Sequence, residues 1–340
     1  MNCRMEEHEM KMQNFKEKDA RVIKKFIEFR KNNNFNKSQT LNLSWSNWGF
    51  GPEPLEVTAE RLAKYNVGYI ELHGNRYGDD LGYKTQETKK ILDHYGIKVS
   101  GVCGMVSPES ELASSSPFVR QRSIDYFRRN IDLCQEMGGS YILFSPGAVG
   151  RPQKYDNIEV ERACETIKIL GDYFVESGVR GALEPVRADE VSLCHTFADA
   201  KHMIDIIDHP GVQHIAGDVF HMMLSESHIA ETILEYGHMM INLHMADSNR
   251  RALGTGMLDL DLIQMALYVV GYNNDTAFCS AEPLGTGANP YVAMHEVSDP
   301  SLLDELVRQT SAYFYEREGE LLNASESELE QLLTFSHLTK

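Results

Sequence analysis

The sequence predicts a (β/α)8 TIM barrel, a closed ring of eight parallel strands each followed by a helix, with an extra N-terminal helix. Short β-rich segments alternate eight times with longer segments whose apolar residues recur at helical spacing. Because parallel strands need a crossover helix between them, this alternation disfavours an antiparallel fold. The repeating units span residues 41–319, close to the roughly 250 residues of such a barrel. An open doubly wound sheet is the alternative, but no G-x-G-x-x-G motif follows the first strand.

The individual elements follow from this alternation in chain order. The predicted strands are 41–46, 68–72, 97–103, 140–144, 180–184, 213–218, 239–244 and 276–282. The predicted helices are 55–65, 85–95, 118–137, 159–177, 196–207, 229–236, 260–270 and 301–317. Gly96, Gly138 and Gly178 each follow a helical segment, where a terminating glycine is favoured. Thr196 and Ser301 are placed as N-terminal caps.

Segments before and after the repeats complete the predicted organisation. The chain divides into an N-terminal helical extension 1–40, a catalytic barrel domain 41–319 and a polar C-terminal tail 320–340. Within the extension, residues 15–29 form an amphipathic pattern in which Val22, Ile23, Phe26 and Ile27 share one face. We expect this helix to cap the bottom of the barrel; contact with a partner subunit is the alternative.

Composition limits the functions that are open to the chain. Its 340 residues carry a net charge of -17, and residues 1–40 are locally +4, so the remaining 300 carry -21. Such an acidic body disfavours nucleic-acid binding. No apolar run approaches the ~18 residues of a membrane span, and no secretory signal is visible, so we expect a cytoplasmic protein. The six cysteines form no C-x-x-C pair and are interpreted as buried reduced thiols.

The ends of predicted strands five to eight carry the chemistry. These strands end in Glu184, Asp218, His244 and Glu282, and the carboxyl ends of barrel strands build the active site. Three carboxylates and one imidazole, without a thiolate, suit Mn²⁺, Mg²⁺ or Co²⁺, although Zn²⁺ and Fe²⁺ stay open. A buried salt-bridge network is the alternative. Recurrence at four equivalent strand ends favours a metal site.

Strand parity predicts which residues lie beneath these ligands. Side chains two positions before each ligand point the same way, namely those of Ala182, Ala216, Asn242 and Ser280. Small and polar residues at these positions leave room beneath the ion. We expect Asn242 or Ser280 to donate a hydrogen bond to a ligand carboxylate.

Four short motifs carry a family resemblance. They are Glu184-Pro185, Asp218-x-Phe220-His221, His244-x-x-Asp247-Ser248-Asn249-Arg250 and Glu282-Pro283. Together they resemble the xylose-isomerase-like sugar isomerase/epimerase superfamily, in particular its D-tagatose and D-psicose 3-epimerase branch. The resemblance implies that Glu184, Asp218, His244 and Glu282 bind one divalent ion, usually Mn²⁺. It also implies that the two glutamates transfer protons.

The same resemblance assigns residues that contact the substrate. By position, Glu190, His221 and Arg250 match the substrate-contacting residues of the family. The alternatives are a backbone-bonded helix-start residue for His221 and a surface cation for Arg250. Trp45 and Trp48 are interpreted as core residues rather than as a platform for a sugar.

Other segments resemble a narrower group, the α subunit of bacterial C-glycoside deglycosidases. They are residues 43–51, 71–75, 144–152 and 284–291. This resemblance implies a lyase that acts on 3-oxo-C-glycosides by β-elimination and pairs with a small β subunit. A ketose 3-epimerase or sugar isomerase is the alternative, and a homo-oligomer is the alternative assembly. The leaving carbon needs an acid, for which His73, His195 and His221 are the candidates, and His73 and His195 are also expected to contact the substrate.

Both functions share one chemical step, in which a carboxylate removes a proton beside a metal-polarised carbonyl. A DNA-repair endonuclease of a related barrel family is a second hypothesis, but the extra histidines of its trinuclear zinc site are missing. A non-catalytic sugar-binding or scaffold subunit is a third, and the intact set of four ligands argues against it.

Overall fold

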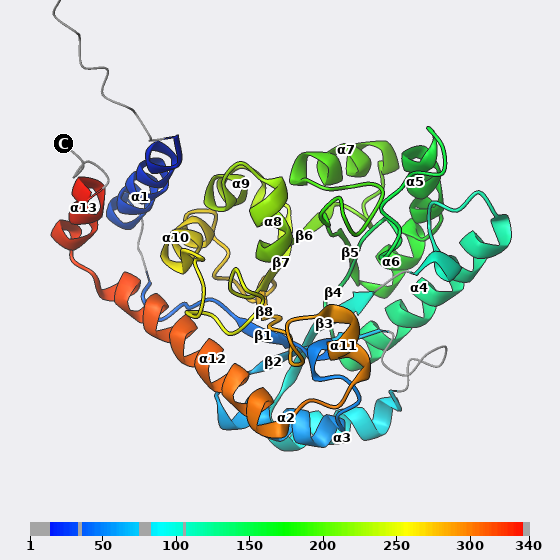
Figure 1. The fold of residues 1–340 in the computed structure, drawn as a ribbon, viewed down its shortest axis with the longest axis horizontal. Coiled ribbons are helices and arrows are strands. Elements are labelled where there is room, and N and C mark those ends of the chain that lie inside the picture. Colours follow the sequence, from blue (N-terminus) through cyan, green and yellow to red (C-terminus); the bar gives the residue numbers. More distant parts are fainter. Residues whose placement is uncertain (1–13, 33–35, 75–82, 105–106, 336–340) are drawn as a thin grey trace, which may run out of the picture.

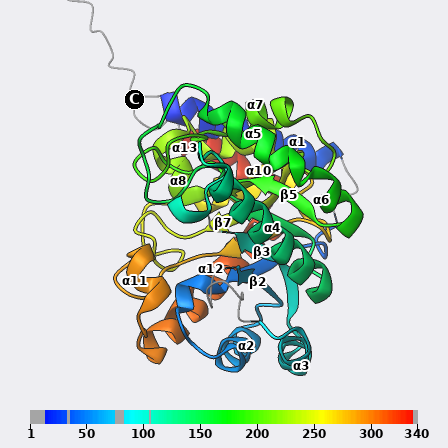
Figure 2. The ribbon, with the colours of Figure 1, turned by 90° about the vertical axis from the view of Figure 1, so that its right-hand side faces the viewer.

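The structure, a computed structural model, describes residues 14–32, 36–74, 83–104 and 107–335. Eight parallel strands form a closed barrel in which each strand pairs with the next and the eighth pairs with the first (Figure 1). Figure 2 shows the helices wrapped around the strands. The predicted fold is confirmed.

The observed elements follow the predicted alternation. The strands are β1 Leu43–Ser46, β2 Tyr69–His73, β3 Lys98–Gly104, β4 Tyr141–Phe144, β5 Arg180–Leu183, β6 His214–Asp218, β7 Met240–Met245 and β8 Phe278–Ala281. The helices are α1 Asn14–Asn32, α2 Leu55–Lys64, α3 Thr85–Tyr95, α4 Pro117–Met137, α5 Glu159–Ile169, α6 Gly171–Ser177, α7 Phe197–Ile207, α8 Val219–Ser225, α9 Ile229–Tyr236, α10 Leu260–Val269, α11 Pro290–His295, α12 Pro300–Asn323 and α13 Glu326–Phe335. Two short 3-10 helices, η1 Asn47–Phe50 and η3 Pro108–Ser110, follow β1 and β3. Each predicted strand overlaps an observed one.

The residues at the helix N-termini show whether the predicted caps are correct. Thr196 caps α7 as predicted, in a capping box where its hydroxyl accepts from Asp199 N and the Asp199 carboxylate accepts from Thr196 N. Ser301 is not the cap of α12, so that prediction is wrong. The Asp299 carboxylate accepts from Ser301 N at 2.8 Å, and Pro300 takes the first helical position. Proline suits that position because it lacks the N–H that would be left unpaired there.

Helix boundaries also differ from the prediction in places. The predicted helix 159–177 is interrupted at Leu170, so it forms α5 and α6. The helix expected to end at Arg317 continues to Asn323, and α13 follows it within the segment predicted as a polar tail. The six-residue α11 and seven-residue α8 were missed because one or two turns are too short to show a helical period.

Helix α1 lies on the flank of the barrel rather than beneath it. It packs against α9, α10 and α13 (Figure 1). Val22 and Phe26 are fully buried there, and the Phe26 ring lies 6.4 Å from that of Tyr268 on α10. The expectation of a helix that caps the bottom is therefore wrong. The apolar face of α1 covers the outer side of α10. In a barrel without such an extra helix, that side of an outer helix faces solvent.

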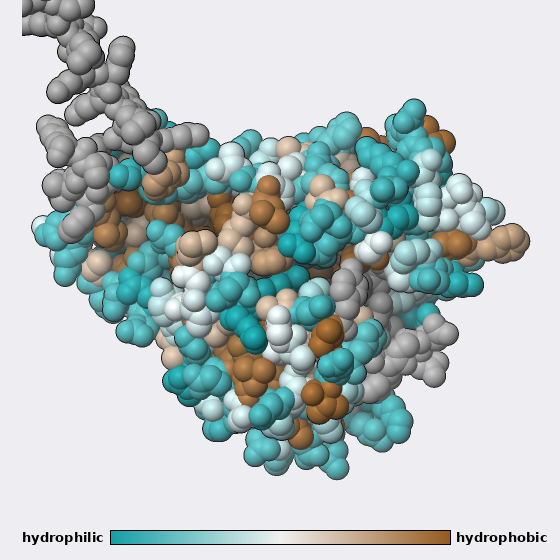
Figure 3. Space-filling model, viewed as in Figure 1, coloured by the Kyte–Doolittle hydropathy of each residue, from teal (hydrophilic) through white to brown (hydrophobic). Residues whose placement is uncertain are grey.

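Apolar residues also remain at the surface beside α1. Phe15, Leu224 and Met257 are largely exposed and line one groove between α1, α8 and α10. Figure 3 shows hydrophobic residues gathered on this face. In the described part of the chain, no helix is long and apolar enough to cross a membrane. The five described cysteines are buried and unbridged, as predicted, while Cys3 lies outside the described residues.

Aromatic side chains fill the barrel interior below the site. Tyr141 is fully buried, and its ring centroid lies 6.0 Å from that of Phe278. A Cβ on Gly101 would come within 2.6 Å of the Tyr141 ring, so a larger residue has no room there. Ala182 and Ala216 contact the same cluster. The small residues that we expected to leave room beneath an ion thus accommodate these rings instead.

Candidate metal centre and active site

The four predicted ligands converge at the carboxyl end of the barrel. Glu184 follows β5, Asp218 ends β6, His244 lies in β7, and Glu282 follows β8. His244 Nδ1 lies 3.2 Å from Glu282 Oε1 and 3.5 Å from Glu184 Oε1. One ligand atom each of Asp218, His244 and Glu282 falls within 4.8 Å of the others. Together with the Glu184 contact, these separations bring the four side chains close enough to act as ligands of one ion.

The chemistry of this donor set fits a divalent cation. Asp218 Oδ2 is buried and has no hydrogen-bond partner among the described residues, which is expensive for a charged oxygen unless a cation lies beside it. Burial, with Asp218 and Glu184 nearby, raises the pKa of Glu282 to about 7. Burial opposes the charged form of His244, but Glu282 and Glu71 raise its pKa well above the ordinary value. Burial is the largest cause of the Glu282 shift, and the neighbouring carboxylates contribute to both shifts; a cation bound here would neutralise that negative charge.

Asp218 has two roles, one for each oxygen. Its Oδ1 accepts a hydrogen bond from Phe220 N at 2.7 Å and so caps the start of α8. Its Oδ2 lies 3.3 Å from His221 Nε2. His221 is buried, and Glu184, Asp218 and His221 form a second group whose ligand atoms lie within 4.8 Å of one another. The short helix α8, missed by the sequence analysis, thus brings His221 into the site.

Arg250 is buried over the same carboxylates. Its Nη2 lies 3.3 Å from Glu282 Oε2 and 3.8 Å from Asp218 Oδ2. The guanidinium carbon lies 4.6 Å from the centre of the Phe220 ring. The backbone of Arg250 is left-handed, with a φ of 56°, and its N–H donates to Asp247 O at 2.7 Å. Arg250 is 5% exposed, which excludes the alternative of a surface cation.

Glu190 reaches the pocket from the loop after β5. Arg187 Nε donates to its Oε1 at 2.6 Å. The backbone of this loop is hydrogen-bonded to the loop after β4. Gly150 N donates to Glu190 O, and Arg151 and Val191 form an isolated parallel β-bridge. Glu190 therefore lies on a supported loop at the pocket wall.

One pocket of about 620 Å³ contains these groups. Its described lining residues are Trp48, Cys103, Gly104, Ser145, Val149, Glu184, Val186, Glu190, Asp218, His221, Arg250, Glu282, Pro290 and Met294. The charged residues form one part of the lining, and Val149, Val186, Pro290 and Met294 form an apolar part. Such a combination is usual for a small-molecule site.

A comparison with a protein-family model identifies the family of this chain. The model of the xylose isomerase-like TIM barrel matches residues 59–294, more than half of the chain. The chain belongs to the xylose isomerase-like TIM barrel family. The superfamily resemblance of the sequence motifs is thereby confirmed.

Relatives within this family are sugar epimerases by name. The L-ribulose 3-epimerase of Methylomonas sp. (strain DH-1) is 24% identical over 200 residues, which cover 56% of this chain and 67% of the relative. The 3-dehydro-D-guloside 4-epimerase of Escherichia coli (strain K12) is 22% identical over 232 residues, which cover 64% and 84%. These names favour the isomerase and epimerase alternative over the lyase that the narrower resemblance implies.

A solved structure of the family shares the fold. The D-allulose 3-epimerase from Methylomonas sp. in complex with D-allulose matches with a TM-score of 0.71 at 20% identity. The match covers 82% of this chain and 97% of that chain.

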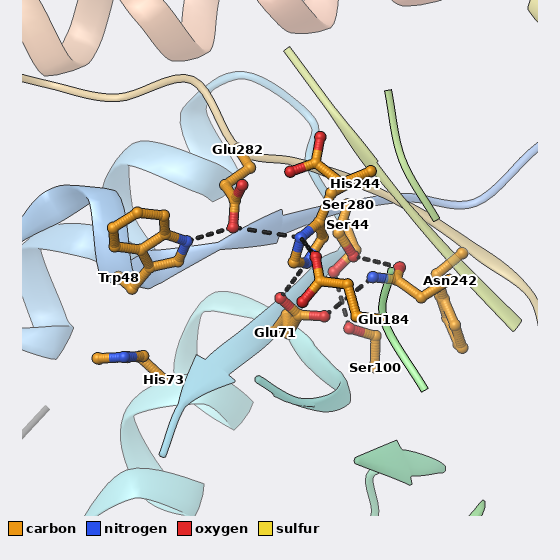
Figure 4. Close-up of polar contacts among 12 residues, drawn as sticks. Ser44, Trp48, Glu71, His73, Ser100, Glu184, Asn242, His244, Ser280 and Glu282 are labelled. Carbon is orange, nitrogen blue, oxygen red and sulfur yellow. Dashed lines mark hydrogen bonds and ion pairs between the residues drawn. The ribbon is translucent and has the colours of Figure 1, made fainter. Parts of the chain in front are cut away.

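Two predicted substrate residues lie behind the residues that line the pocket. His73 is buried at the end of β2, with its ring 6.2 Å from that of Trp48. His195 is half-buried, and its Nδ1 is 2.9 Å from Val186 O. Neither is among the described residues that line the pocket. Figure 4 shows His73 away from the group that surrounds His244.

Two residues near the centre were missed or misread. Trp48, interpreted as core, lines the pocket, and its Nε1 donates a hydrogen bond to Glu282 Oε1. Glu71, to which no role was given, accepts from His244 Nε2 at 2.7 Å. The expected hydrogen bond from Asn242 or Ser280 to a ligand carboxylate is absent among the described residues. Asn242 Nδ2 donates instead to Glu71 Oε2 at 3.1 Å, because Glu71 is the acceptor that lies beneath the histidine.

Proposed function

We propose that this protein is a metal-dependent epimerase or isomerase of a sugar that carries a carbonyl group. The observation that carries the proposal is the close approach of Glu184, Asp218, His244 and Glu282 to one another at the pocket. Epimerases among the named relatives support it. Mn²⁺ is the ion we propose for these four residues, with Co²⁺ or Mg²⁺ as alternatives, because oxygen donors with one imidazole suit them.

The glutamates give the site an acid and a base. When bound, a divalent ion polarises a substrate carbonyl and stabilises the negative charge that develops on its oxygen. One of Glu184 and Glu282 then takes the proton from the carbon beside the carbonyl. The other returns a proton to the opposite face, which inverts that carbon. The two side chains suit this task because they come from β5 and β8, separated around the barrel by β6 and β7.

Other chain groups position the acid and base. Arg250 and Trp48 both contact the Glu282 carboxylate, so they fix its orientation. His221 and Glu190 line the same pocket and are proposed to hold sugar hydroxyls. Because Arg250 is the one cationic residue in the described lining and is already paired, the site favours a neutral sugar over a sugar phosphate.

The apolar part of the pocket favours a second candidate, the C-glycoside deglycosidase α subunit. Val149, Val186, Pro290 and Met294 offer a surface for an apolar group attached to the sugar. In this reaction a glutamate removes the proton at C2 of a 3-oxo sugar, and the electron pair forms the C1–C2 double bond. The bond from C1 to the aglycone breaks, and the aglycone carbon takes a proton, for which His221 is the candidate acid. A small β subunit is the partner proposed with this candidate.

A single experiment separates the two candidates. The purified chain with Mn²⁺ is incubated in D₂O with D-fructose, D-psicose or a 3-oxo-C-glycoside, and products are followed by chromatography and NMR. Epimerisation with deuterium on the inverted carbon supports the first proposal. Release of an aglycone, without ketose epimerisation, supports the second. No deuterium in either ketose, from a chain that binds Mn²⁺, contradicts the first proposal. No aglycone release even after co-expression with the small open reading frame beside its gene contradicts the second.

A further inference from the structure

We propose that Glu71 is a positioning residue for the metal site, which fixes the ring and the protonated nitrogen of His244 from below. The inference uses the metal site of the proposed function but concerns a residue from a strand that carries none of its ligands. Glu71 lies in β2, across the barrel from β7. Figure 4 shows its carboxylate directed at the His244 ring, on the side away from Glu282.

The hydrogen bond between these residues selects one form of the imidazole. Glu71 Oε1 lies 2.7 Å from His244 Nε2, and a carboxylate can only accept, so the proton lies on Nε2. When a cation takes the place of the proton on Nδ1, that nitrogen would present its lone pair to the space between Glu184 and Glu282. A metal ligand needs that lone pair, and a carboxylate on the other ring nitrogen also raises its basicity.

The second oxygen of Glu71 is held by two donors. Tyr141 Oη donates to Oε2 at 2.7 Å, and Asn242 Nδ2 donates at 3.1 Å. Asn242 is itself fixed, because Ser280 Oγ donates to its Oδ1 at 2.7 Å. With His244, three donors therefore share the two oxygens of one carboxylate.

Burial makes this arrangement specific to a glutamate. Glu71, Tyr141, Asn242 and Ser280 are all fully buried. A Glu71→Gln side chain carries an amide nitrogen, which cannot accept from any of the three donors. If the amide turns toward His244, the proton must move to Nδ1 and occupy the lone pair of the ligand. If it turns the other way, it faces Tyr141 and Asn242, and donors are left unpaired.

The test compares Mn²⁺ and Co²⁺ affinity in the wild-type chain, Glu71→Gln and a matched control, by calorimetry. The control is Glu318→Gln. Glu318 is also buried and accepts two hydrogen bonds, from Leu41 N at 2.7 Å and Tyr268 Oη at 2.6 Å, outside the site. We expect Glu71→Gln to weaken metal binding by about 10–100-fold and to alter the visible spectrum of the Co²⁺ form. Glu318→Gln should lower the melting temperature while its metal affinity stays that of the wild type.

A second variant keeps the test informative if Glu71→Gln does not fold. Tyr141→Phe removes one donor to Glu71 and keeps the ring, so it should weaken Co²⁺ binding in the same direction by a smaller factor. Wild-type affinity and spectrum in a folded Glu71→Gln, or in Tyr141→Phe when that is the variant that folds, overturn the inference alone. Failure of the wild-type chain to bind either metal overturns the inference and the proposed function together.

Discussion

The two halves of the barrel make unequal contributions to the site. Strands β5 to β8 carry all four converging side chains, Glu184, Asp218, His244 and Glu282. Strands β1 to β4 carry none of them. Instead, β2 and β4 supply Glu71 and Tyr141, which lie beneath the histidine. Strands β5 to β8 therefore form the half that would contact the metal and substrate. Strands β1 to β4, with the segments that follow them, form the supporting half, which holds the ligand side chains in place.

This division predicts two kinds of variant. Changes at the carboxyl ends of β5 to β8 should remove activity from a chain that still folds. Changes in β1 to β4, or in the barrel interior below the site, should act on stability, or on the site through another residue. We expect each residue below to behave as its place in the barrel requires.

Glu282→Gln should have the largest effect on turnover. It removes one of the two proposed proton-transfer groups and one of the four proposed ligands, so we expect a loss of about 10²–10⁴-fold in kcat. Steady-state kinetics, with whichever of the three candidate substrates the wild-type chain converts, measures this loss of kcat. The exposed Glu235→Gln serves as the matched control and should retain wild-type kcat. A Glu282→Gln enzyme with more than a tenth of wild-type turnover would remove this residue from the mechanism.

Phe278→Ala should have the largest effect on stability. The ring fills the interior below the site, and the cavity left behind should lower the free energy of unfolding by about 3–5 kcal/mol. Urea denaturation measures this change. Phe118 is 84% exposed, so Phe118→Ala is the control and should stay within about 0.5 kcal/mol of wild type. Equal effects of the two substitutions would show that the interior rings do not support the barrel.

Trp48→Phe tests a residue of the supporting half that contacts a proposed proton-transfer group, Glu282, directly. It keeps an aromatic wall but removes the hydrogen bond to Glu282 Oε1. Hydrogen bonds to charged groups contribute about 1.5–3 kcal/mol, so kcat/KM should fall by about 10–100-fold. Trp45→Phe, in the core, should leave kcat/KM unchanged. Wild-type kcat/KM in Trp48→Phe would mean that Arg250 alone is enough to orient Glu282.

The same division explains what could be predicted from the sequence. The four strand-end residues were accessible because the barrel places every strand end on one rim, so a local motif fixes a position in space. Glu71 was not accessible, since its partner is 173 positions away and a glutamate inside a strand gives no signal of its own. Parity correctly placed Asn242 inside the barrel, but the choice of acceptor depends on a neighbour across the ring.

Packing between segments that are distant in the sequence could not be predicted either. The apolar face of α1 was visible, but the surface that it covers is formed by α9, α10 and α13, far along the chain. Trp48 looked like a core residue because only the folded structure shows that its N–H reaches Glu282. His73 and His195 lie beside Trp48 and Val186, which line the pocket, and their contact with the substrate stays a prediction.

Asp304→Asn should have the smallest effect and should change stability without changing chemistry. Asp304 on α12 accepts hydrogen bonds from Arg61 at 2.7 Å and Lys64 at 3.0 Å on α2, a helix on the outer surface of the supporting half. Partial burial opposes ionisation, but these two cations keep the pKa of Asp304 below its ordinary value of 3.8. Because the folded pKa is the lower one, the contribution to stability is complete above the unfolded pKa and is lost as the pH falls through the folded pKa.

At pH 7 the substitution should therefore lower the free energy of unfolding by about 0.5–1 kcal/mol, since solvent screens this half-exposed pair. The difference from wild type should shrink below about pH 4, and kcat should be unchanged at every pH where the protein is folded. Urea denaturation at pH 7 and pH 3, with kinetics at pH 7, measures both. A change in kcat would mean that the outer helices of the supporting half reach the site, and the separation between the two halves would then fail.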